Sequence, residues 1–201
     1  MGGNHVRFLV ILIISGIASG WALTAAAKPV GITPTIDEIT VPTPNGDVSI
    51  SRVQDNENRV DDGWTRTSRA CPPFCIQPMT PAEGVTTIGE LELLQMLVDP
   101  EMLVIDSRVV EHFIGGSIPG ALSIPHSEVT DRLDELGCEI DFDGFDCQAA
   151  KTVALFCNGP WCGQSPSAAR NMIAAGYPAD RIFYYRGGMQ NWRMLGLTVT
   201  K

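Results

Sequence analysis

The fold is decided by the stretch that runs from residue 152 to residue 166 and reads TVALFCNGPWCGQSP. Its first five residues are apolar or β-branched and predict a buried strand over 152–156 that ends at Cys157. A loop that contains glycine follows, and Ser165 as a cap with proline next to it predicts a helix over 165–175. This order of strand, loop and helix places Cys157 among the free N–H groups of a helix start.

Predicted strands and helices alternate on both sides of this stretch. We expect further strands over 102–105, 121–124 and 181–185, and further helices over 88–97, 127–136 and 189–195. The alternation predicts an α/β fold with a central parallel sheet that helices cover on both faces. In such a sheet, ligands bind at the carboxyl ends of the strands, where Cys157 is expected to lie.

Composition limits what the molecule can bind. The chain has 201 residues, enough for one domain of ordinary size with an extension, and 44% of them are hydrophobic. A formal net charge of −9 argues against a nucleic-acid backbone or an anionic membrane surface as a partner, since both need clustered Lys and Arg. Six cysteines are too few for a disulfide-built miniprotein, and they leave redox chemistry and structural bridges both open.

Residues 1–27 have the layout of a secretory signal peptide. Arg7 precedes a long apolar run that ends in the small residues Ala25-Ala26-Ala27. We expect cleavage after this last alanine and export to the periplasm. The alternative is an uncleaved anchor that holds the chain at the membrane facing the periplasm, because the run is long enough to span a bilayer.

Residues 28–85 are expected to form an extended arm, and residues 86–201 the α/β domain. The arm is rich in Pro, Thr, Asp and Asn, and the turn signal Asn45-Gly46 predicts a small hairpin. Cys71 and Cys75 are expected to form a structural bridge that pins the arm to the domain. A redox pair and a metal site are the alternatives for these two cysteines, although their spacing fits no standard zinc pattern.

The Cys157 thiol is the predicted chemical centre. A thiol beside a helix N-terminus and curled loop amides is expected to have its pKa lowered from near 8.5 to about 3.5–7.5. The thiolate is the reactive form, so this position favours a nucleophile. The alternative is a buried, inert cysteine at the end of a strand.

Several motifs resemble those of the rhodanese domain. Residues 103–121 read LVIDSRVVEHFIGGSIPGA and are similar to its opening signature, and residues 187–196, GGMQNWRMLG, are similar to its closing motif. Cys157 matches the catalytic cysteine of that family, and the resemblance covers about residues 86–199. The matching residues of the opening signature are Asp106, Arg108, Glu111, Gly116, Ile118, Pro119, Gly120 and Ala121.

The resemblance implies a single-domain α/β sulfurtransferase. Its cysteine takes a sulfane sulfur from a donor such as thiosulfate, holds it as a persulfide and passes it to a thiophilic acceptor. The expected substrate is a small sulfur-containing anion or a thiol, and we expect no metal and no cofactor. Cys157 and Cys162 are the catalytic candidates. The other candidates are the substrate-binding loop residues Asn158, Gly159, Trp161, Gly163, Gln164 and Ser165, and the supporting residues Asp106, Arg108 and Arg186.

Two features of the loop depart from the family pattern. The usual loop has four residues between the cysteine and an Arg or Lys that precedes a serine, whereas here Ser165 lies two positions further on. The loop also lacks Arg and Lys, and Cys162 stands near the place of that cation, while Arg170 and Arg186 lie outside the loop. Longer loops suit larger oxyanions, as in the cell-cycle phosphatases that share the fold. Those enzymes hold phosphate with a loop arginine, so its absence argues against a phosphatase.

The remaining motifs allow structural and functional interpretations. Cys162 is either a second thiol that resolves a persulfide or a small buried loop residue. Cys138 and Cys147 bracket an acidic loop, and a disulfide between them would contribute about 2–3 kcal/mol. The spacing of the acidic residues there is not that of a calcium loop. His112 and His126 are expected to be ordinary surface or helix-edge residues.

Three functional hypotheses follow from these patterns. The first is an exported sulfurtransferase with the persulfide on Cys157. The second is a thiol–disulfide or redox-sensing protein that uses Cys157 and Cys162 with a redox partner protein. The third is a non-catalytic module that uses the fold and the arm to hold a partner.

Overall fold

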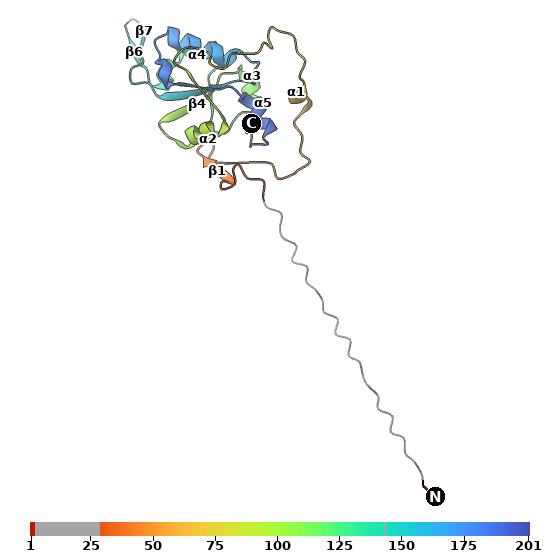
Figure 1. Cartoon of the computed structure of the whole chain (residues 1–201). Helices are drawn as coiled ribbons and strands as arrows, with labels where there is room; N and C mark the ends of the chain where they lie inside the picture. The colour runs from red at the N-terminus through yellow and green to blue at the C-terminus, as the bar shows by residue number, and fades with distance from the viewer. Residues whose placement is uncertain (3–28, 143) are drawn as a thin grey trace.

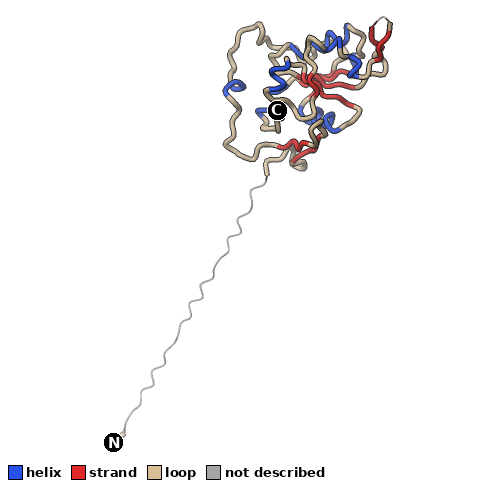
Figure 2. Tube along the Cα trace, turned by 180° about the vertical axis from the view of Figure 1, so that it is seen from behind, coloured by secondary structure: helices blue, strands red, loops and turns tan. Residues whose placement is uncertain are grey.

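The computed structural model describes residues 1–2, 29–142 and 144–201. The signal peptide predicted over 1–27 lies outside this part apart from its first two residues, so its cleavage stays a prediction. No helix within the described ranges is long and apolar enough to cross a membrane. Figures 1 and 2 show helices packed around a central sheet, with the arm running along one side of the body.

A five-stranded parallel sheet forms the centre of the molecule, which confirms the predicted fold class. β8 occupies the middle position and pairs along its whole length with β4 on one side and from Val153 to Phe156 with β9 on the other. Cys157 therefore follows the most central strand. The strand order is β3 (Thr86–Ile88), β9 (Ile182–Tyr185), β8 (Thr152–Phe156), β4 (Met102–Asp106) and β5 (Leu122–Ser123).

The edge strand β3 is a feature that the sequence pattern misses. Ile88, which the apolar pattern assigns to a helix, instead ends β3 and pairs with Tyr185 of β9. The helix α2 begins two residues later and spans Glu90–Val98. A strand of three residues is too short to show a period of two, so only its pairing with β9 reveals it.

Helices cover both faces of the sheet, as Figure 1 shows for α4 and α2 on opposite sides of β4. One face packs α2 and α5 (Gly188–Met194) against residues such as Val104 and Phe156. The other face packs α4 (Gln164–Ala174) against residues such as Ile105 and Leu155. Successive residues of a strand point to opposite faces, so β4 and β8 supply side chains to both layers.

The prediction of an α-helix over 127–136 is wrong, because this segment is 3₁₀-helical. The segment forms two 3₁₀ turns, η1 (Val129–Asp131) and η2 (Leu133–Leu136). Leu133 and Leu136 are three residues apart and both fully buried, and this spacing matches the three residues per turn of a 3₁₀ helix. Two further short elements are α3 (Val110–Ile114) and the 3₁₀ turn η3 (Ala179–Arg181).

The arm forms the predicted hairpin and packs onto the domain. β1 (Glu38–Val41) pairs antiparallel with β2 (Val48–Ser51), as the Asn45-Gly46 turn signal predicts. Val41 and Ile50 of this hairpin are fully buried and belong to the same core cluster as α2. Beyond the hairpin, the arm passes the single turn α1 (Asp62–Thr65) and reaches the top of the sheet in the view of Figure 1.

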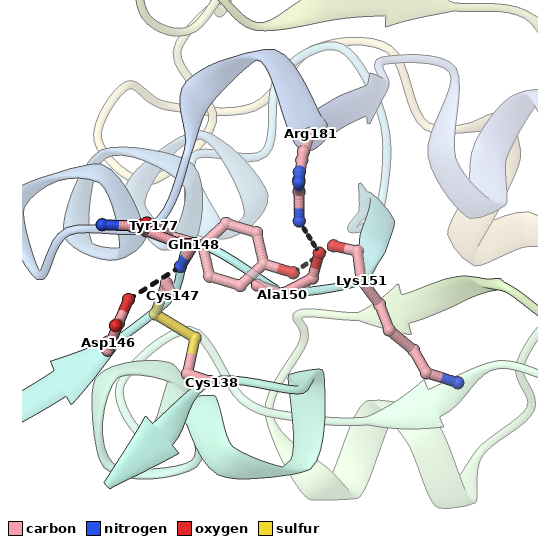
Figure 3. The surroundings of a disulfide bond; sticks show 8 residues. All are labelled: Cys138, Asp146, Cys147, Gln148, Ala150, Lys151, Tyr177 and Arg181. Atoms are coloured by element: carbon pink, nitrogen blue, oxygen red, sulfur yellow. Dashed lines mark hydrogen bonds between the residues drawn. A yellow bond between two sulfur atoms is a disulfide. The ribbon is translucent and has the colours of Figure 1, made fainter. Parts of the chain in front are cut away.

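Two disulfides form among the described cysteines, and both pairings match the sequence predictions. Cys71–Cys75 closes a turn of the arm, and Cys138–Cys147 closes the base of a small surface hairpin. That hairpin consists of β6 (Glu139–Asp141) and β7 (Gly144–Asp146). Figure 3 shows that the tyrosine hydroxyl of Tyr177 donates to the carbonyl of Lys151 close to this bridge. Arg181 donates to the neighbouring carbonyl of Ala150, so the segment between the bridge and β8 is held from two sides.

Candidate functional site

Cys157 lies directly after β8, at the carboxyl end of the sheet, as predicted. Two backbone hydrogen bonds of 3.0 Å tie the start of its loop to α5: Met189 N–H donates to the Cys157 carbonyl, and Gln190 N–H donates to the Asn158 carbonyl. Gly188 has a φ of +55°, and a Cβ there would lie 2.3 Å from the Cys157 carbonyl oxygen. This close approach explains why glycine is needed at this position of the closing motif.

The Cys157 sulfur is buried and contacted from two directions. Its residue is only 2% exposed. The Ser165 hydroxyl donates to Cys157 Sγ at 3.0 Å, and the Cys157 thiol donates to the Cys162 carbonyl oxygen at 3.2 Å. Ser165 is fully buried and makes no cap to the helix, so its predicted role as N-cap is wrong; the cap position of α4 belongs to Gly163. The helix begins at Gln164, so Ser165 lies in its first turn, and its hydroxyl donates to the sulfur atom.

Cys162 returns to Cys157 because the loop curls on itself. Its N–H donates to the Gly159 carbonyl at 2.9 Å, which closes a tight turn. Cys162 Sγ lies 3.6 Å from Gln164 Oε1 and 4.0 Å from Asn158 Nδ2. Cys162 and Cys157 are the free cysteines of the described chain, and their side chains interact directly.

The two thiols differ in acidity, and the shift in the pKa of Cys157 is opposite to the predicted lowering. Burial raises the pKa of Cys157 well above its usual value, and the neighbouring Cys162 raises it further. The hydrogen bond from Cys157 lowers the pKa of Cys162 to about 7, helped by backbone groups of Asn158 and Gln164. The pair therefore loses its first proton from Cys162, because that sulfur is less buried and better supplied with donors.

A buried ion pair between Asp106 and Arg108 contacts the loop that follows Cys157. Arg108 Nη2 lies 2.6 Å from Asp106 Oδ2, and the two side chains are 2% and 0% exposed. The Ser117 hydroxyl also donates to Asp106 Oδ2 at 2.6 Å. Arg108 Nη1 reaches Asn158 Oδ1 at 3.4 Å, so the pair that ends β4 orients the residue after Cys157. The Asp-x-Arg pair thus contacts the loop through Asn158.

Cys162, and not Cys157, lines the cleft beside the loop. This cleft has a volume of about 540 Å³. Its walls come from the loop, from α4, from α3 and from the arm, which contributes Pro73 and Phe74. Three groups that carry or can carry positive charge line it, namely Arg170, His112 and His126, and none of the described lining residues is acidic. The cleft therefore suits an anion although the whole chain is acidic.

A second cavity of about 400 Å³ lies on the other side of Trp161 and Asn158, which line both spaces. Arg69 of the arm stacks over the rings of Phe74 and Trp161, at 4.7 and 5.1 Å from their centroids. Arg193 of α5 stacks over Trp64 at 5.2 Å and also lines this cavity. Arg69 of the arm and Arg193 of α5 thus bring to this cavity guanidinium groups that the loop itself lacks, beside the carboxylates of Asp61 and Glu111.

The two arginines that could replace the missing loop cation, Arg170 and Arg186, have different positions in the structure. Arg170 lines the cleft and donates to the Pro81 carbonyl at 3.4 Å. Arg186 donates to the Gln77 carbonyl at 3.0 Å and does not line the cleft. Arg186 therefore supports the arm, while Arg170 is the arginine that stands nearest to a ligand beside Cys162.

The other predicted loop residues build the loop rather than point toward Cys157. The Trp161 indole N–H donates to Gln190 Oε1 at 2.7 Å, which pins the loop to α5. Gly159 lies against the same glutamine, where a Cβ would come within 3.0 Å of Oε1. Gly163 packs near Gln77 of the arm, whose N–H donates to the Pro160 carbonyl at 2.8 Å.

Sequence reasoning missed several residues of the site. His112 is exposed on the helix α3, which agrees with the expected surface or helix-edge position, but its Nδ1 also lies 3.3 Å from Asn158 Nδ2 and it lines both cavities. Phe74 and Arg69 belong to the arm, where no sequence motif links them to the loop. Only the folded chain brings these segments together, since they are more than eighty residues from Cys157 in sequence.

These features define a class of protein: an α/β domain in which a cysteine-bearing loop joins the central parallel strand to a helix. The model of the rhodanese-like domain family matches residues 90–195, more than half of the chain. The protein belongs to the rhodanese-like domain family.

Individual relatives match the chain over different shares of their own length. An HTH-type transcriptional regulator of Mycobacterium tuberculosis is 32% identical over 120 residues, which cover 60% of this chain and 46% of that protein. The chain thus spans less than half the length of this relative. A rhodanese-related protein of Thermoplasma volcanium is 25% identical with a TM-score of 0.42, over 57% of this chain and 97% of that one. A protein of Bacillus halodurans is 23% identical with a TM-score of 0.46, over 57% of this chain and 76% of that one.

Proposed function

We propose that the protein is an exported sulfurtransferase that carries sulfane sulfur as a persulfide on Cys157. The observation that carries this proposal is the 3.0 Å contact from the Ser165 hydroxyl to Cys157 Sγ, at the start of the 11-residue helix α4. A hydroxyl donor and a helix N-terminus both stabilise negative charge on sulfur. A persulfide anion held on Cys157 needs such stabilisation.

The reaction starts from the pair with one proton removed. The Cys162 thiolate accepts the proton of Cys157 as Cys157 attacks the outer sulfur of thiosulfate. A new S–S bond forms on Cys157, the S–S bond of thiosulfate breaks, and sulfite leaves with the electron pair. This division of roles fits the two pKa values, because the more acidic thiol of the pair acts as the base for the buried one.

The surroundings of the cleft support an anionic donor. Arg170, His112 and His126 lie along its walls, and Arg69 and Arg193 line the adjoining cavity. In this proposal these groups attract and hold the donor, in place of the Arg or Lys that the family loop normally contains. The acceptor is then a small thiol or other thiophile that enters the same cleft.

Export rests on the N-terminal sequence. The apolar run before Ala27 suits a signal peptide, with a membrane anchor as the alternative. The two disulfides of the described chain are in keeping with an oxidising compartment. The net charge of −9 gives no reason to expect a nucleic-acid partner. Sizing the chain after expression with its leader, in periplasmic and membrane fractions, distinguishes cleavage from anchoring.

Intact-mass measurement tests the proposed activity. The reduced protein, freed of reductant and given thiosulfate, is expected to release sulfite, and its Cys162→Ser variant is expected to release sulfite and gain the mass of one sulfur atom. Cys157→Ser is expected to do neither. If no sulfane donor leads to sulfite release or added sulfur, or if Cys157→Ser still releases sulfite or gains sulfur, the proposal is wrong. A folded protein whose Cys157 stays inert would instead support a non-catalytic binding module.

A further inference from the structure

The loop holds two unlike thiols that face each other across one turn. Cys157 is buried behind the loop, and its sulfur contacts Ser165 and the carbonyl of Cys162. Cys162 lines the cleft, and its sulfur contacts Gln164 Oε1. One thiol is thus placed to hold a sulfur atom and the other to meet molecules that enter the cleft.

We propose that Cys162 is a resolving thiol, which removes the sulfur held on Cys157 as hydrosulfide and leaves a Cys157–Cys162 disulfide. The proposal rests on the proposed function, because it requires a persulfide on Cys157. It adds an activity to that function: the reduction of a sulfane sulfur to sulfide by two thiols of the same loop.

The chemical step balances within the loop. Cys162, which holds the proton taken from Cys157, attacks the inner sulfur of the Cys157 persulfide. The bond between the two cysteine sulfurs forms, and the bond to the outer sulfur breaks. The outer sulfur leaves as HS⁻ with the electron pair and with the proton of Cys162. The sulfane sulfur is reduced by two electrons, and the two thiols are oxidised to a disulfide.

The geometry of the loop favours this step over transfer to an external thiol. The turn from Gly159 to Cys162, closed by a 2.9 Å hydrogen bond, folds Cys162 back onto Cys157. Trp161 directly precedes Cys162 in this turn. Its indole N–H donates to Gln190 at 2.7 Å, and its ring packs against Phe74 of the arm. A resolving thiol held in contact acts at a far higher effective concentration than a dissolved one.

The same arrangement explains how the disulfide would be reopened. A dithiol reductant that enters the cleft meets the sulfur of Cys162, because Cys162 lines that space and Cys157 does not. Attack on Cys162 releases Cys157 as a thiolate, which returns to the Ser165 hydroxyl. Continuous turnover therefore needs a dithiol of this class, whereas a single turnover needs none.

A single-turnover experiment tests the proposal. The full chain is reduced, separated from reductant without air, and mixed with one equivalent of thiosulfate, and then sulfite, sulfide and protein mass are measured. The wild type is expected to release one equivalent each of sulfite and sulfide and to lose the mass of two hydrogens. Peptide mapping is expected to find a new Cys157–Cys162 cross-link.

Two variants separate this proposal from the proposed function. Cys162→Ser is expected to release sulfite, keep the sulfur on Cys157 and release no sulfide until dithiothreitol is added. Cys157→Ser is expected to release neither product. A double variant, Cys138→Ser with Cys147→Ser, is the matched control, because it removes a cysteine pair outside the loop; with its fold checked by circular dichroism, it should release sulfide like the wild type.

Three outcomes would overturn the proposal. Wild-type protein that keeps its sulfur without releasing sulfide would leave the proposed function standing and remove the role of Cys162. Sulfide release from Cys162→Ser at the wild-type rate would do the same. Wild-type protein that releases neither sulfite nor sulfide and gains no sulfur would show that the proposed function itself is wrong.

Discussion

The phenyl ring of Phe74 lies against the indole ring of Trp161, with their centroids 4.6 Å apart. Phe74 sits in the turn of the arm that Cys71–Cys75 closes, and Trp161 sits in the loop after Cys157. Arg69 covers both rings with its guanidinium group. The arm therefore forms part of the wall of the candidate site, although its sequence shows no motif of the domain.

Phe74→Ala is expected to weaken this wall. An aromatic pair of this kind contributes about 0.5–1.5 kcal/mol beyond the area that it buries, so KM for thiosulfate should rise about two- to tenfold. Cys162 should also alkylate faster, because its cleft opens toward the arm. Steady-state kinetics and iodoacetamide labelling measure the two effects. Phe142→Ala, which removes a fully exposed ring, is the control; equal behaviour of the two variants would contradict the role of the arm.

Ser165→Ala is expected to slow persulfide formation on Cys157. A hydrogen bond to a charged group contributes about 1.5–3 kcal/mol, so the rate of sulfite release should fall about ten- to a hundredfold. Ser107→Ala is a matched control, because Ser107 is also fully buried and its hydroxyl has no hydrogen-bond partner. Rapid-mixing measurements of sulfite report the rates. Similar rates for both variants would show that the Ser165 hydroxyl does not act on the sulfur.

The rate of sulfur loading is expected to rise with pH through about 7. Below this value both thiols are protonated and no base is present, because the pKa of Cys162 is about 7. Above it, the Cys162 thiolate can take the proton of Cys157. In Cys162→Ser the rise should move to higher pH, since burial raises the pKa of the remaining Cys157 thiol. A profile that is identical in the two proteins would exclude Cys162 as the base.

Arg108→Ala is expected to destabilise the fold by about 3–5 kcal/mol, because it leaves the buried Asp106 carboxylate without its partner. Arg132→Ala removes a surface ion pair with Glu135 at 2.6 Å and is expected to cost at most about 1 kcal/mol. Urea denaturation followed by circular dichroism measures both free energies of unfolding. Equal losses would mean that the buried pair is not the support that its contacts indicate.

Removing Cys138–Cys147 is expected to affect stability and not chemistry. The bridge closes a short loop over the β6–β7 hairpin, and its loss should lower the free energy of unfolding by about 2–3 kcal/mol. Sulfur loading should be unchanged, because this hairpin protrudes from the body (Figure 1) and none of its described residues lines the cleft. A large loss of activity in folded protein would contradict this separation.

The sequence by itself determined the parts of this protein that are local. The strand, the loop and the helix around Cys157 follow from apolar residues, glycine and proline that act on neighbouring positions. The Asp106-x-Arg108 signature, the Asn45-Gly46 hairpin and the two disulfides also join residues that are close along the chain.

Only the tertiary structure decided which thiol faces the cleft and which is buried. The acidity of Cys157 and Cys162 depends on burial and on donors from several segments, and burial raises the pKa of Cys157 although a helix N-terminus alone predicts that it is lowered. The same holds for β3, which exists through its pairing with β9, and for Phe74, which reaches Trp161 across the fold. Such contacts form between segments that are distant in sequence, so local residue patterns do not predict them.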